Sequence, residues 1–342
     1  LAESHEVSDD GLVNVIRLRQ DVPFHNGETM TAADVIASIN RWGAISGVGQ
    51  SLLGATDELR EVDDYTIEFH LAEPYGSLAT ALAINYQGCA IYPKSVIDAA
   101  GDAPIDNDFI GTGPYQLEER RIDQFIRLQR FDDYAALEGE PLGYGGHKAQ
   151  YLDRIDFIPV ADEAARVAGL QAGDYHLLTD FSSDQFETIA ANPDLVVEKL
   201  PPSSWDTLVL NWNSPLMSDL LVRQAFQDAL NHEPIMLAAH GEGFYRLDPS
   251  IMQRETAWAT DAGAELYNQN DPEKARALLE EAGYDGTPLR LLSTQEYQYL
   301  YNVALVSAQQ LEDAGFTVDL QTYDWATLVE RRADPEMWDA FT

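Results

Sequence analysis

The side chains that most often carry chemistry in proteins are scattered singly along these 342 residues. None of the seven histidines lies near a cysteine or a second histidine at the spacing of a metal site. The chain also lacks the sequence patterns of a nucleophile elbow, a phosphate-binding loop, a dinucleotide-binding loop and a zinc-protease helix. Acidic pairs are too frequent here to single out a catalytic pair. We therefore expect no catalytic residue, no metal and no cofactor.

Three residues remain as candidate nucleophiles, namely Ser203, Ser204 and Cys89. A serine needs a positioned base before it can attack a substrate, and the sequence offers no evident base for this pair. Cys89 lies in an apolar run at residues 88–91, which predicts a buried and inert thiol. An α/β hydrolytic enzyme with a dispersed site stays open as an alternative. Sustained turnover of peptides or esters that is lost on changing Ser203 or Ser204 would support it.

Aromatic and polar residues that follow predicted strands are better suited to binding. In parallel α/β sheets, ligands bind outside the carboxyl ends of the strands. A cleft with aromatic walls and polar edges is typical of a site for a small solute. The proline-rich segment at residues 201–205 crosses between the two halves of the chain and belongs with these strand ends. The candidate ligand-binding residues are Phe181, Ser203, Trp205, Thr294, Tyr297, Tyr323 and Trp325.

The elements that must position these residues alternate between strand and helix. Alternating apolar and polar residues predict strands, and apolar residues at helical spacing predict helices. The predicted strands span residues 13–19, 59–62, 65–71, 115–121, 124–130, 154–159, 175–180, 195–200, 205–211, 289–293 and 318–322, with another starting at Met337. The predicted helices span residues 32–42, 78–84, 93–100, 162–172, 183–191, 219–230, 233–239, 272–282, 297–314 and 326–332. This rhythm favours α/β lobes with largely parallel sheets.

Two glycine-rich segments interrupt the rhythm. Residues 43–54 are predicted to be a loop rich in glycine and serine. Residues 109–115 contain Gly111, Gly113 and Pro114, in which the glycines permit backbone angles that other residues avoid and the proline cannot donate a ladder hydrogen bond. We interpret this second segment as a rigid turn that feeds a strand at Tyr115. It is expected to be scaffold rather than a ligand contact.

Composition limits the partners of the protein. The formal net charge is −37, from 58 acidic and 21 basic residues, and only four residues are lysine. Nucleic acid and anionic membrane surfaces are therefore not expected as partners, because both require a basic surface. The single cysteine excludes an internal disulfide, and no apolar run reaches the length of a membrane span. The chain is long enough for two lobes with separate cores.

Six segments are notable for their order along the chain. They are residues 15–35 (VIRLRQDVPFHNGETMTAADV), 111–115 (GTGPY), 151–155 (YLDRI), 164–173 (AARVAGLQAG), Asn211 with 222–226 (VRQAF), and 271–284 (DPEKARALLEEAGY). As a set, they resemble the motifs of the family 5 extracellular solute-binding proteins, which are the dipeptide, oligopeptide and nickel receptors of ABC importers. One departure is Asn231-His232, where the family usually has an Asp-Arg pair.

The resemblance implies a periplasmic-binding-protein type II fold, with two α/β lobes, a ligand cleft between them and a subdomain inserted in the first lobe. Lobe I would span residues 1–202, with the inserted subdomain at about 13–108. Lobe II would span residues 203–342. Relative to the family, we expect further sequence before and after these residues. An acidic residue that can anchor a peptide's amino terminus in the family would lie just after Thr342.

The resemblance also implies a function. The protein would be the substrate-binding component of an ABC importer, capturing a peptide-like solute by hinge closure and delivering it to the permease subunits. It would be a monomer in the periplasm or anchored at the cell surface. A nickel chelate, haem, an opine or an oligosaccharide would be alternative ligands of the same fold.

Overall fold

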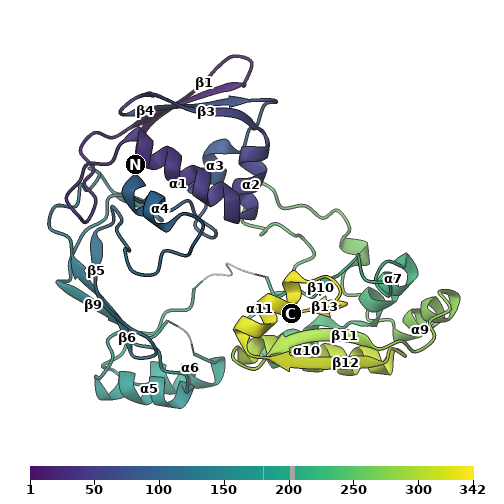
Figure 1. Ribbon diagram of the computed structural model, residues 1–342. Coiled ribbons are helices and arrows are strands. Elements are labelled where there is room, and N and C mark those ends of the chain that lie inside the picture. The colour runs from purple at the N-terminus through teal and green to yellow at the C-terminus, as the bar shows by residue number, and fades with distance from the viewer. Residues whose placement is uncertain (180, 201–204) are drawn as a thin grey trace. The chain divides into compact units, whose positions relative to one another are not determined.

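The computed structural model describes residues 1–179, 181–200 and 205–342, and the chain divides into two compact units, Leu1–Ala161 and Asp162–Thr342 (Figure 1). The predicted lobe boundary after residue 202 lies outside the described residues. The division between the compact units falls earlier in the chain. The assignment of residues 1–202 and 203–342 to two lobes therefore stays a prediction, and each unit is described by itself.

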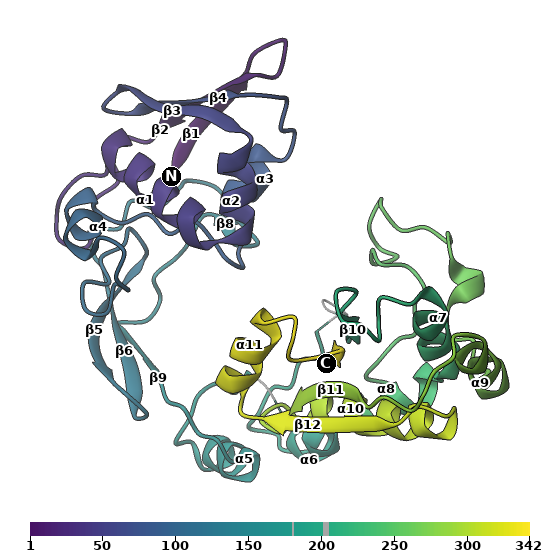
Figure 2. The same ribbon diagram turned by 45° about the vertical axis from the view of Figure 1, so that its right-hand side comes forward.

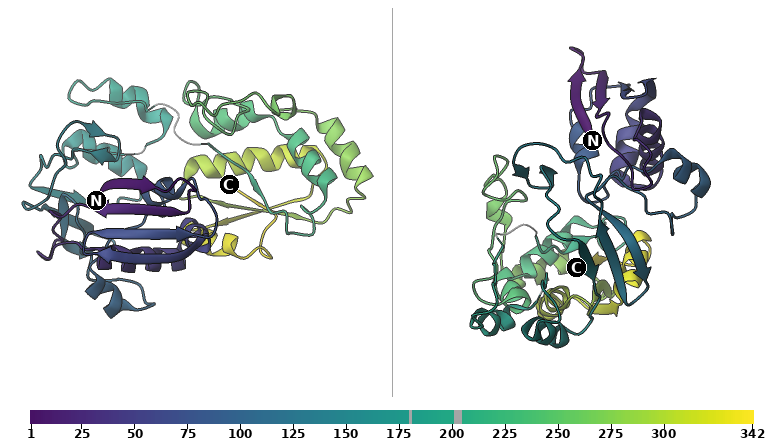
Figure 3. Two further views of the ribbon diagram at one scale, coloured as in Figure 1. Left: turned by 90° about the horizontal axis from the view of Figure 1, so that it is seen from above. Right: turned by 90° about the vertical axis from the view of Figure 1, so that its left-hand side faces the viewer.

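The first unit opens with a four-stranded antiparallel sheet in the order β1-β2-β4-β3. Helix α1 lies along one face of this sheet (Figure 3, left). Alternate side chains of β2 and β4 face the helix, so that Ile16, Leu18, Ile67 and Phe69 are buried. The strands are β1 (Ala2–Val7), β2 (Val13–Leu18), β3 (Thr56–Asp63) and β4 (Thr66–Leu71).

Helix α1 (Ala32–Ile45) begins where the sequence predicts. The Asp34 carboxylate accepts hydrogen bonds from the Thr31 backbone N–H and hydroxyl, both at 2.8 Å, which closes a capping box at the start of the helix. Val35, Ile39 and Trp42 recur at helical spacing and pack on the sheet. The helix therefore stabilises the sheet through one apolar stripe.

The predicted loop at residues 43–54 is wrong. The first helix continues to Ile45, and a second helix, α2 (Gly47–Gly54), follows after Ser46, whose hydroxyl accepts a hydrogen bond from Gly49 N at 3.3 Å. A Cβ on Gly49 would lie 2.8 Å from Gly43 Cα, which is closer than real Cβ atoms approach. The glycines are present because two helices meet there, and not because the chain must turn.

Replacing Gly49 by alanine is expected to lower the free energy of unfolding by about 1–3 kcal/mol, since the new methyl group overlaps the backbone of α1. Gly54, at the other end of the same helix, has open space around its hypothetical Cβ and serves as the control. Gly54→Ala should be neutral or stabilising by up to about 1 kcal/mol. Urea unfolding of both variants measures the difference, and equal effects would show that the close approach does not matter.

The rest of the first unit contains two more antiparallel sheets. They are a three-stranded sheet in the order β5-β6-β9 and a small hairpin. The expectation of largely parallel sheets is wrong for the described residues of this unit, since tight turns such as the one at Asp123 join neighbouring strands directly. The elements are α3 (Leu78–Ala83), α4 (Lys94–Ala100), β5 (Tyr115–Arg121), β6 (Phe125–Arg130), β7 (Pro141–Leu142), β8 (Gly145–Gly146) and β9 (Arg154–Phe157).

The turn at residues 111–115 is held by His25. Gly111 N–H donates to His25 Nδ1 at 3.2 Å, and His25 Nε2 lies 3.1 Å from Gly113 O. Together these contacts require a neutral imidazole with its proton on Nε2. Neither Gly111 nor Gly113 has a positive φ, so the unusual backbone angles expected there do not occur. As predicted, the turn leads directly into a strand at Tyr115.

The neutral state of His25 should make stability depend on pH. Burial lowers the pKa of His25 from its ordinary value of 6.5, although the contact with Gly113 acts in the opposite direction. The stabilisation by His25 is therefore present above about pH 6.5 and is lost as the pH falls through the lower folded pKa. His25→Ala should cost about 1–2 kcal/mol at pH 8 and less at pH 5.5. Urea unfolding at the two pH values tests this, and a pH-independent cost would contradict it.

The second unit is built around a four-stranded sheet in the order β10-β13-β11-β12. Strand β11 (Leu289–Thr294) is parallel to both β12 (Val318–Tyr323) and β13 (Ala340–Phe341), whereas β10 (Val209–Leu210) is antiparallel to β13. The expected parallel α/β arrangement is confirmed for these three strands. Residues from far apart in the sequence therefore share one sheet.

Both faces of β11 are buried. Leu289 and Leu291 face the main core, which includes Val303 of α10, whereas Leu292 packs with Leu328 of α11. Figure 2 shows α10 and α11 beside this sheet. The helices are α5 (Glu163–Ala172), α6 (Phe186–Ala190), α7 (Leu220–Ala229), α8 (His232–His240), α9 (Pro272–Glu281), α10 (Gln298–Asp313) and α11 (Trp325–Ala333).

Three predicted strands of the second half are wrong in whole or part. Residues 175–179 and 195–200 form no strand, and only Val209–Leu210 of the predicted strand at residues 205–211 pairs with a neighbour. Leu177, Val196 and Leu200 are all exposed. Their apolar residues match the pattern expected of a strand, but a strand also needs a neighbouring strand to accept and donate its backbone hydrogen bonds. Within the described residues, neither segment pairs with another strand.

Candidate functional site

The carboxyl ends of β11 and β12 bring four of the predicted binding residues together. Thr294 and Tyr323 end the two parallel strands and are paired in register. Tyr297 is the N-cap residue of α10, and Trp325 is the first residue of α11. The rings of Tyr297 and Trp325 meet edge to face, with their centroids 5.1 Å apart. The site therefore forms because both strands lead into helices at the same edge of the sheet.

Thr294 differs from the other three because its side chain is fully buried. Its hydroxyl accepts a hydrogen bond from Glu296 N at 3.2 Å, and this contact shapes the turn that leads to Tyr297. Tyr297, in contrast, is 38% exposed and can offer its ring to a ligand. The threonine hydroxyl therefore fixes the turn, whereas the tyrosine ring is accessible to solvent.

A second tyrosine extends this surface. The ring of Tyr299 lies 6.2 Å from that of Tyr297, and we call Tyr299, Tyr297 and Trp325 the aromatic row. The imidazole of His240 stacks on Tyr299 at 5.6 Å, and its Nε2 lies 2.8 Å from a carboxylate oxygen of Asp206. The row therefore ends at an aspartate–histidine pair. The sequence offered one hint, since Tyr299 lies two residues after Tyr297, but nothing in it linked Asp206 to His240.

Two arginines of α11 contact aromatic rings at the Trp325 end of the row. The guanidinium of Arg331 lies 4.3 Å from the ring centroid of Tyr323, and that of Arg332 lies 5.5 Å from those of both Trp325 and Phe341. Such cation–π contacts hold a guanidinium in a defined plane. The sequence analysis missed both residues, because a helical position gives no sign of which ring it covers.

Of the remaining predicted site residues, Ser203 lies outside the described residues. Trp205 is 48% exposed and immediately precedes Asp206. Phe181 is partly buried beside Ser182, whose hydroxyl donates to Glu163 at 2.7 Å. In the part of the chain that the structure describes, no ring contact links Phe181 or Trp205 to the aromatic row.

Other side chains with reactive potential offer little chemistry. Burial raises the pKa of Cys89 to about 12, so the thiol stays protonated at neutral pH, as an inert cysteine should.

Over residues 1–179, 181–200 and 205–342, no group of three or more His, Cys, Asp or Glu residues is placed to hold a metal ion. No helix in these same ranges combines the length and the apolar character that crossing a bilayer requires.

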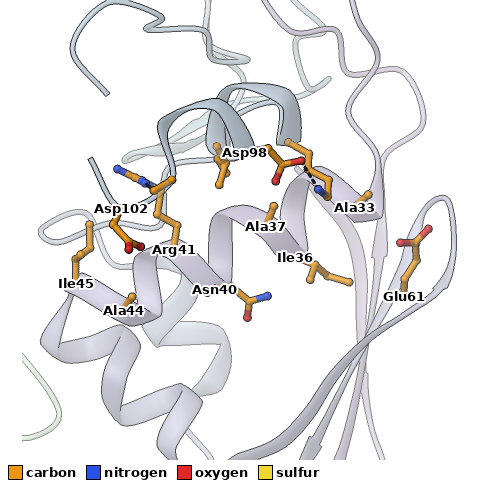
Figure 4. A pocket seen from close by; sticks show the side chains of 13 residues that line it. Ala33, Ile36, Ala37, Asn40, Arg41, Ala44, Ile45, Glu61, Asp98 and Asp102 are labelled. Atoms are coloured by element: carbon orange, nitrogen blue, oxygen red, sulfur yellow. Dashed lines mark hydrogen bonds and ion pairs between the residues drawn. The ribbon is translucent and has the colours of Figure 1, made fainter. Parts of the chain in front are cut away.

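The first unit has a groove of about 860 Å³ on the outer side of α1 (Figure 4). Small side chains of α1, such as Ala37 and Ala44, form its floor, and α4 forms one wall. Its cations are already engaged, because Arg41 donates to Gly101 O and Ala103 O and Lys94 pairs with Asp98. None of the predicted binding residues lines it, so we assign it no ligand.

Comparison with solved structures identifies the fold of this chain. AgaA of A. tumefaciens R10, solved in complex with agropinic acid, has a TM-score of 0.81 and 26% identity, covering 100% of this chain and 67% of that one. DppA of Helicobacter pylori, solved with the peptide STSA, has a TM-score of 0.79 and 23% identity, covering 97% and 66%. The chain therefore has the fold of the type II periplasmic-binding proteins, as predicted.

The whole length of the sequence matches one protein family. The model of the bacterial extracellular solute-binding proteins, family 5 Middle, matches residues 1–342. A probable peptide ABC transporter periplasmic-binding protein, y4tO of Sinorhizobium fredii, is 31% identical over 97% of this chain. The chain belongs to the family 5 extracellular solute-binding proteins, which confirms the resemblance. It spans 64% of the length of y4tO.

Proposed function

We propose that the protein is the substrate-binding component of an ABC importer, which captures a peptide-like solute by hinge closure and delivers it to the permease subunits. The observation that carries this proposal is the aromatic row at the carboxyl edge of β11 and β12, where α/β proteins bind ligands. Membership of a solute-binding family supports it, and so does the similarity to a probable peptide-binding relative. No chemical change of the ligand is proposed.

The rings of Tyr297, Tyr323 and Trp325 would form the apolar wall of the site and contact the ligand. Thr294 would hold the turn that leads to Tyr297. Phe181, Ser203 and Trp205 would complete the site from other segments. The permease would receive the ligand from a monomeric protein in the periplasm or at the cell surface, which agrees with the periplasmic relative. Nucleic acid is not proposed as a partner.

A second candidate ligand is an acidic opine. AgaA, which was solved with agropinic acid, matches the whole of this chain with a TM-score of 0.81. The same binding experiment should therefore include agropinic acid beside the peptides.

Tryptophan fluorescence and thermal shift against a library of short peptides and agropinic acid test this function. Trp325→Ala should weaken binding of the ligand found by about tenfold to a hundredfold, given the large surface that an aromatic wall contributes. Trp212→Ala is the matched control, since Trp212 is 67% exposed and stacks only on Arg223 among its ring contacts in the described residues.

Two outcomes would contradict the proposal. The first is no response to any compound, and the second is equal weakening by the Trp325 and Trp212 variants. Sustained turnover of peptides or esters that is lost on changing Ser203 would instead support the hydrolytic alternative.

A further inference from the structure

Arg331 and Arg332 are two adjacent cations on α11 of a very acidic protein, which has 58 acidic and 21 basic residues. Three other arginines of the second unit, Arg246, Arg254 and Arg290, pair with a carboxylate. Among the described residues, neither Arg331 nor Arg332 has such an ion pair; the guanidinium of Arg331 lies over one aromatic ring and that of Arg332 over two. In the described part of the chain, two adjacent positive charges beside the aromatic row therefore have no carboxylate partner.

The geometry of these side chains suits an anion. A guanidinium stacked on a ring uses its face for that contact, which leaves its N–H groups in the plane of the fork. That fork matches the two oxygens of a carboxylate, and such charge-assisted hydrogen bonds are strong and directional. Both arginines are partly buried, which reduces screening by water. The stacking also limits the number of rotamers that a bound carboxylate would have to freeze.

The helix that carries them is held in place. Trp338 Nε1 donates to the backbone carbonyl of Arg332 at 3.1 Å, and Leu328 packs against Leu292 of the central strand. At the start of the same helix, Asp324 caps the backbone by accepting from Thr327 N at 2.9 Å. The two guanidinium groups are thus presented by a helix fixed at both ends rather than by a loose loop.

We propose that Arg331 and Arg332 form the carboxylate-binding end of the aromatic row. This inference rests on the proposed function, and it names the chemical class of the ligand as a solute with at least one carboxylate next to an apolar or aromatic portion. The carboxylate lies in the plane of the guanidinium groups, while the rest of the ligand extends over Trp325 and Tyr297.

Isothermal titration with three matched peptide pools tests the inference. The first pool consists of tetrapeptides with a free C-terminal carboxylate, the second of the same peptides as C-terminal amides, and the third of amidated peptides that carry one glutamate side chain. The protein should bind the first or the third pool at least tenfold more tightly than the second. The pool that binds best shows whether the protein recognises the C-terminal carboxylate or a glutamate side chain.

Variants show whether the arginines are responsible. Arg331→Gln and Arg332→Gln should each reduce the preference for the carboxylate pool over the amide pool by about tenfold, with the melting temperature of the free protein as a check on folding. Arg332→Lys keeps the charge but loses the planar fork, so it should retain part of the preference and covers the case in which the glutamine variant does not fold. Arg120→Gln is the matched control, because Arg120 also lies over a ring, that of Phe109 at 5.9 Å, but belongs to the first unit.

The outcomes separate the two proposals. If carboxylate and amide pools bind equally well, or if both glutamine variants keep the full preference, the inference is wrong while the solute-binding function stands. If the Arg120 control loses the preference as much as the others, the arginines of α11 are not specific and the inference is also wrong. If no pool binds and agropinic acid does not bind either, the proposed function fails and the inference fails with it.

Discussion

Replacing Asp339 by alanine is expected to lower the free energy of unfolding by about 3 kcal/mol. The side chain of Asp339 is almost completely buried, and its carboxylate accepts hydrogen bonds from Arg290 Nε at 2.9 Å and from Arg290 Nη2 at 3.0 Å. The backbone N–H of Arg290 donates to the same carboxylate at 2.9 Å. Alanine would leave this guanidinium without its partner. The cost falls at the lower end for buried pairs because the arginine side chain is 30% exposed.

An exposed ion pair provides the control for this variant. Asp98, which pairs with Lys94 on α4, has a side chain that is 59% exposed, so Asp98→Ala should change stability by no more than about 0.5 kcal/mol. Urea or thermal unfolding of the two variants measures the contrast. Similar small losses in both would show that the Arg290–Asp339 pair contributes no more than a surface pair.

The same pair predicts a loss of stability in acid. Burial, the largest single influence, acts to raise the pKa of Asp339, but hydrogen bonds from Arg290 and Ser214 outweigh it and lower the pKa below its ordinary value of 3.8. The stabilisation is therefore fully present above about pH 4 and is lost as the pH falls through the lower folded pKa. The unfolding curves of the wild-type protein and of Asp339→Ala should approach each other below that pH.

Replacing Phe69 by alanine is expected to destabilise the first unit by about 3–5 kcal/mol. Phe69 is completely buried on β4, where it shares a core with Phe24 and Ile39. That core has no member in common with the main core of the second unit. Hydrogen exchange measured by mass spectrometry should therefore show lost protection in Leu1–Ala161 and unchanged protection in Asp162–Thr342.

A variant at an exposed position of the first unit is the control for Phe69→Ala. Ile45 is 75% exposed at the end of α1, so Ile45→Ala should leave the exchange of both units nearly unchanged. If Phe69→Ala reduced protection in both units to the same degree, the two cores would unfold as one cooperative body.

Local signals explain which parts of the fold could be predicted. The helices predicted at residues 32–42, 162–172 and 272–282 are confirmed, because the signals at their ends act within a few residues. These signals are the capping box of Thr31 and Asp34, the left-handed Gly173 after α5 and the Asp271–Pro272 start of α9. Sheet direction and strand pairing depend on segments far apart in the sequence, which local patterns do not encode. The same limit explains Gly43 and Gly49, whose role is visible only once α1 and α2 are packed together.

The candidate site shows the same contrast between features that local sequence patterns predict and contacts that form only in the folded unit. The grouping of Tyr297, Tyr323 and Trp325 at one sheet edge could be predicted, because the carboxyl ends of neighbouring parallel strands lie at the same edge. His240 and Asp206, in contrast, lie 34 residues apart and meet only in the folded unit. Arg331 and Arg332 are distinguished only by the aromatic rings that they contact in the folded unit, which the sequence does not indicate.

The position of β13 has a consequence for how the protein is made. Its residues Ala340–Phe341 lie between β10 and β11 in the sheet, although they follow both strands in the sequence. During synthesis, more than a hundred residues are added after Val209–Leu210 before the strand that pairs with them, Ala340–Phe341, has been made. The first unit, whose sheet pairs strands made early, can fold meanwhile. The sheet of the second unit should therefore be completed late, because β11 lacks one of its two neighbouring strands until β13 has been made.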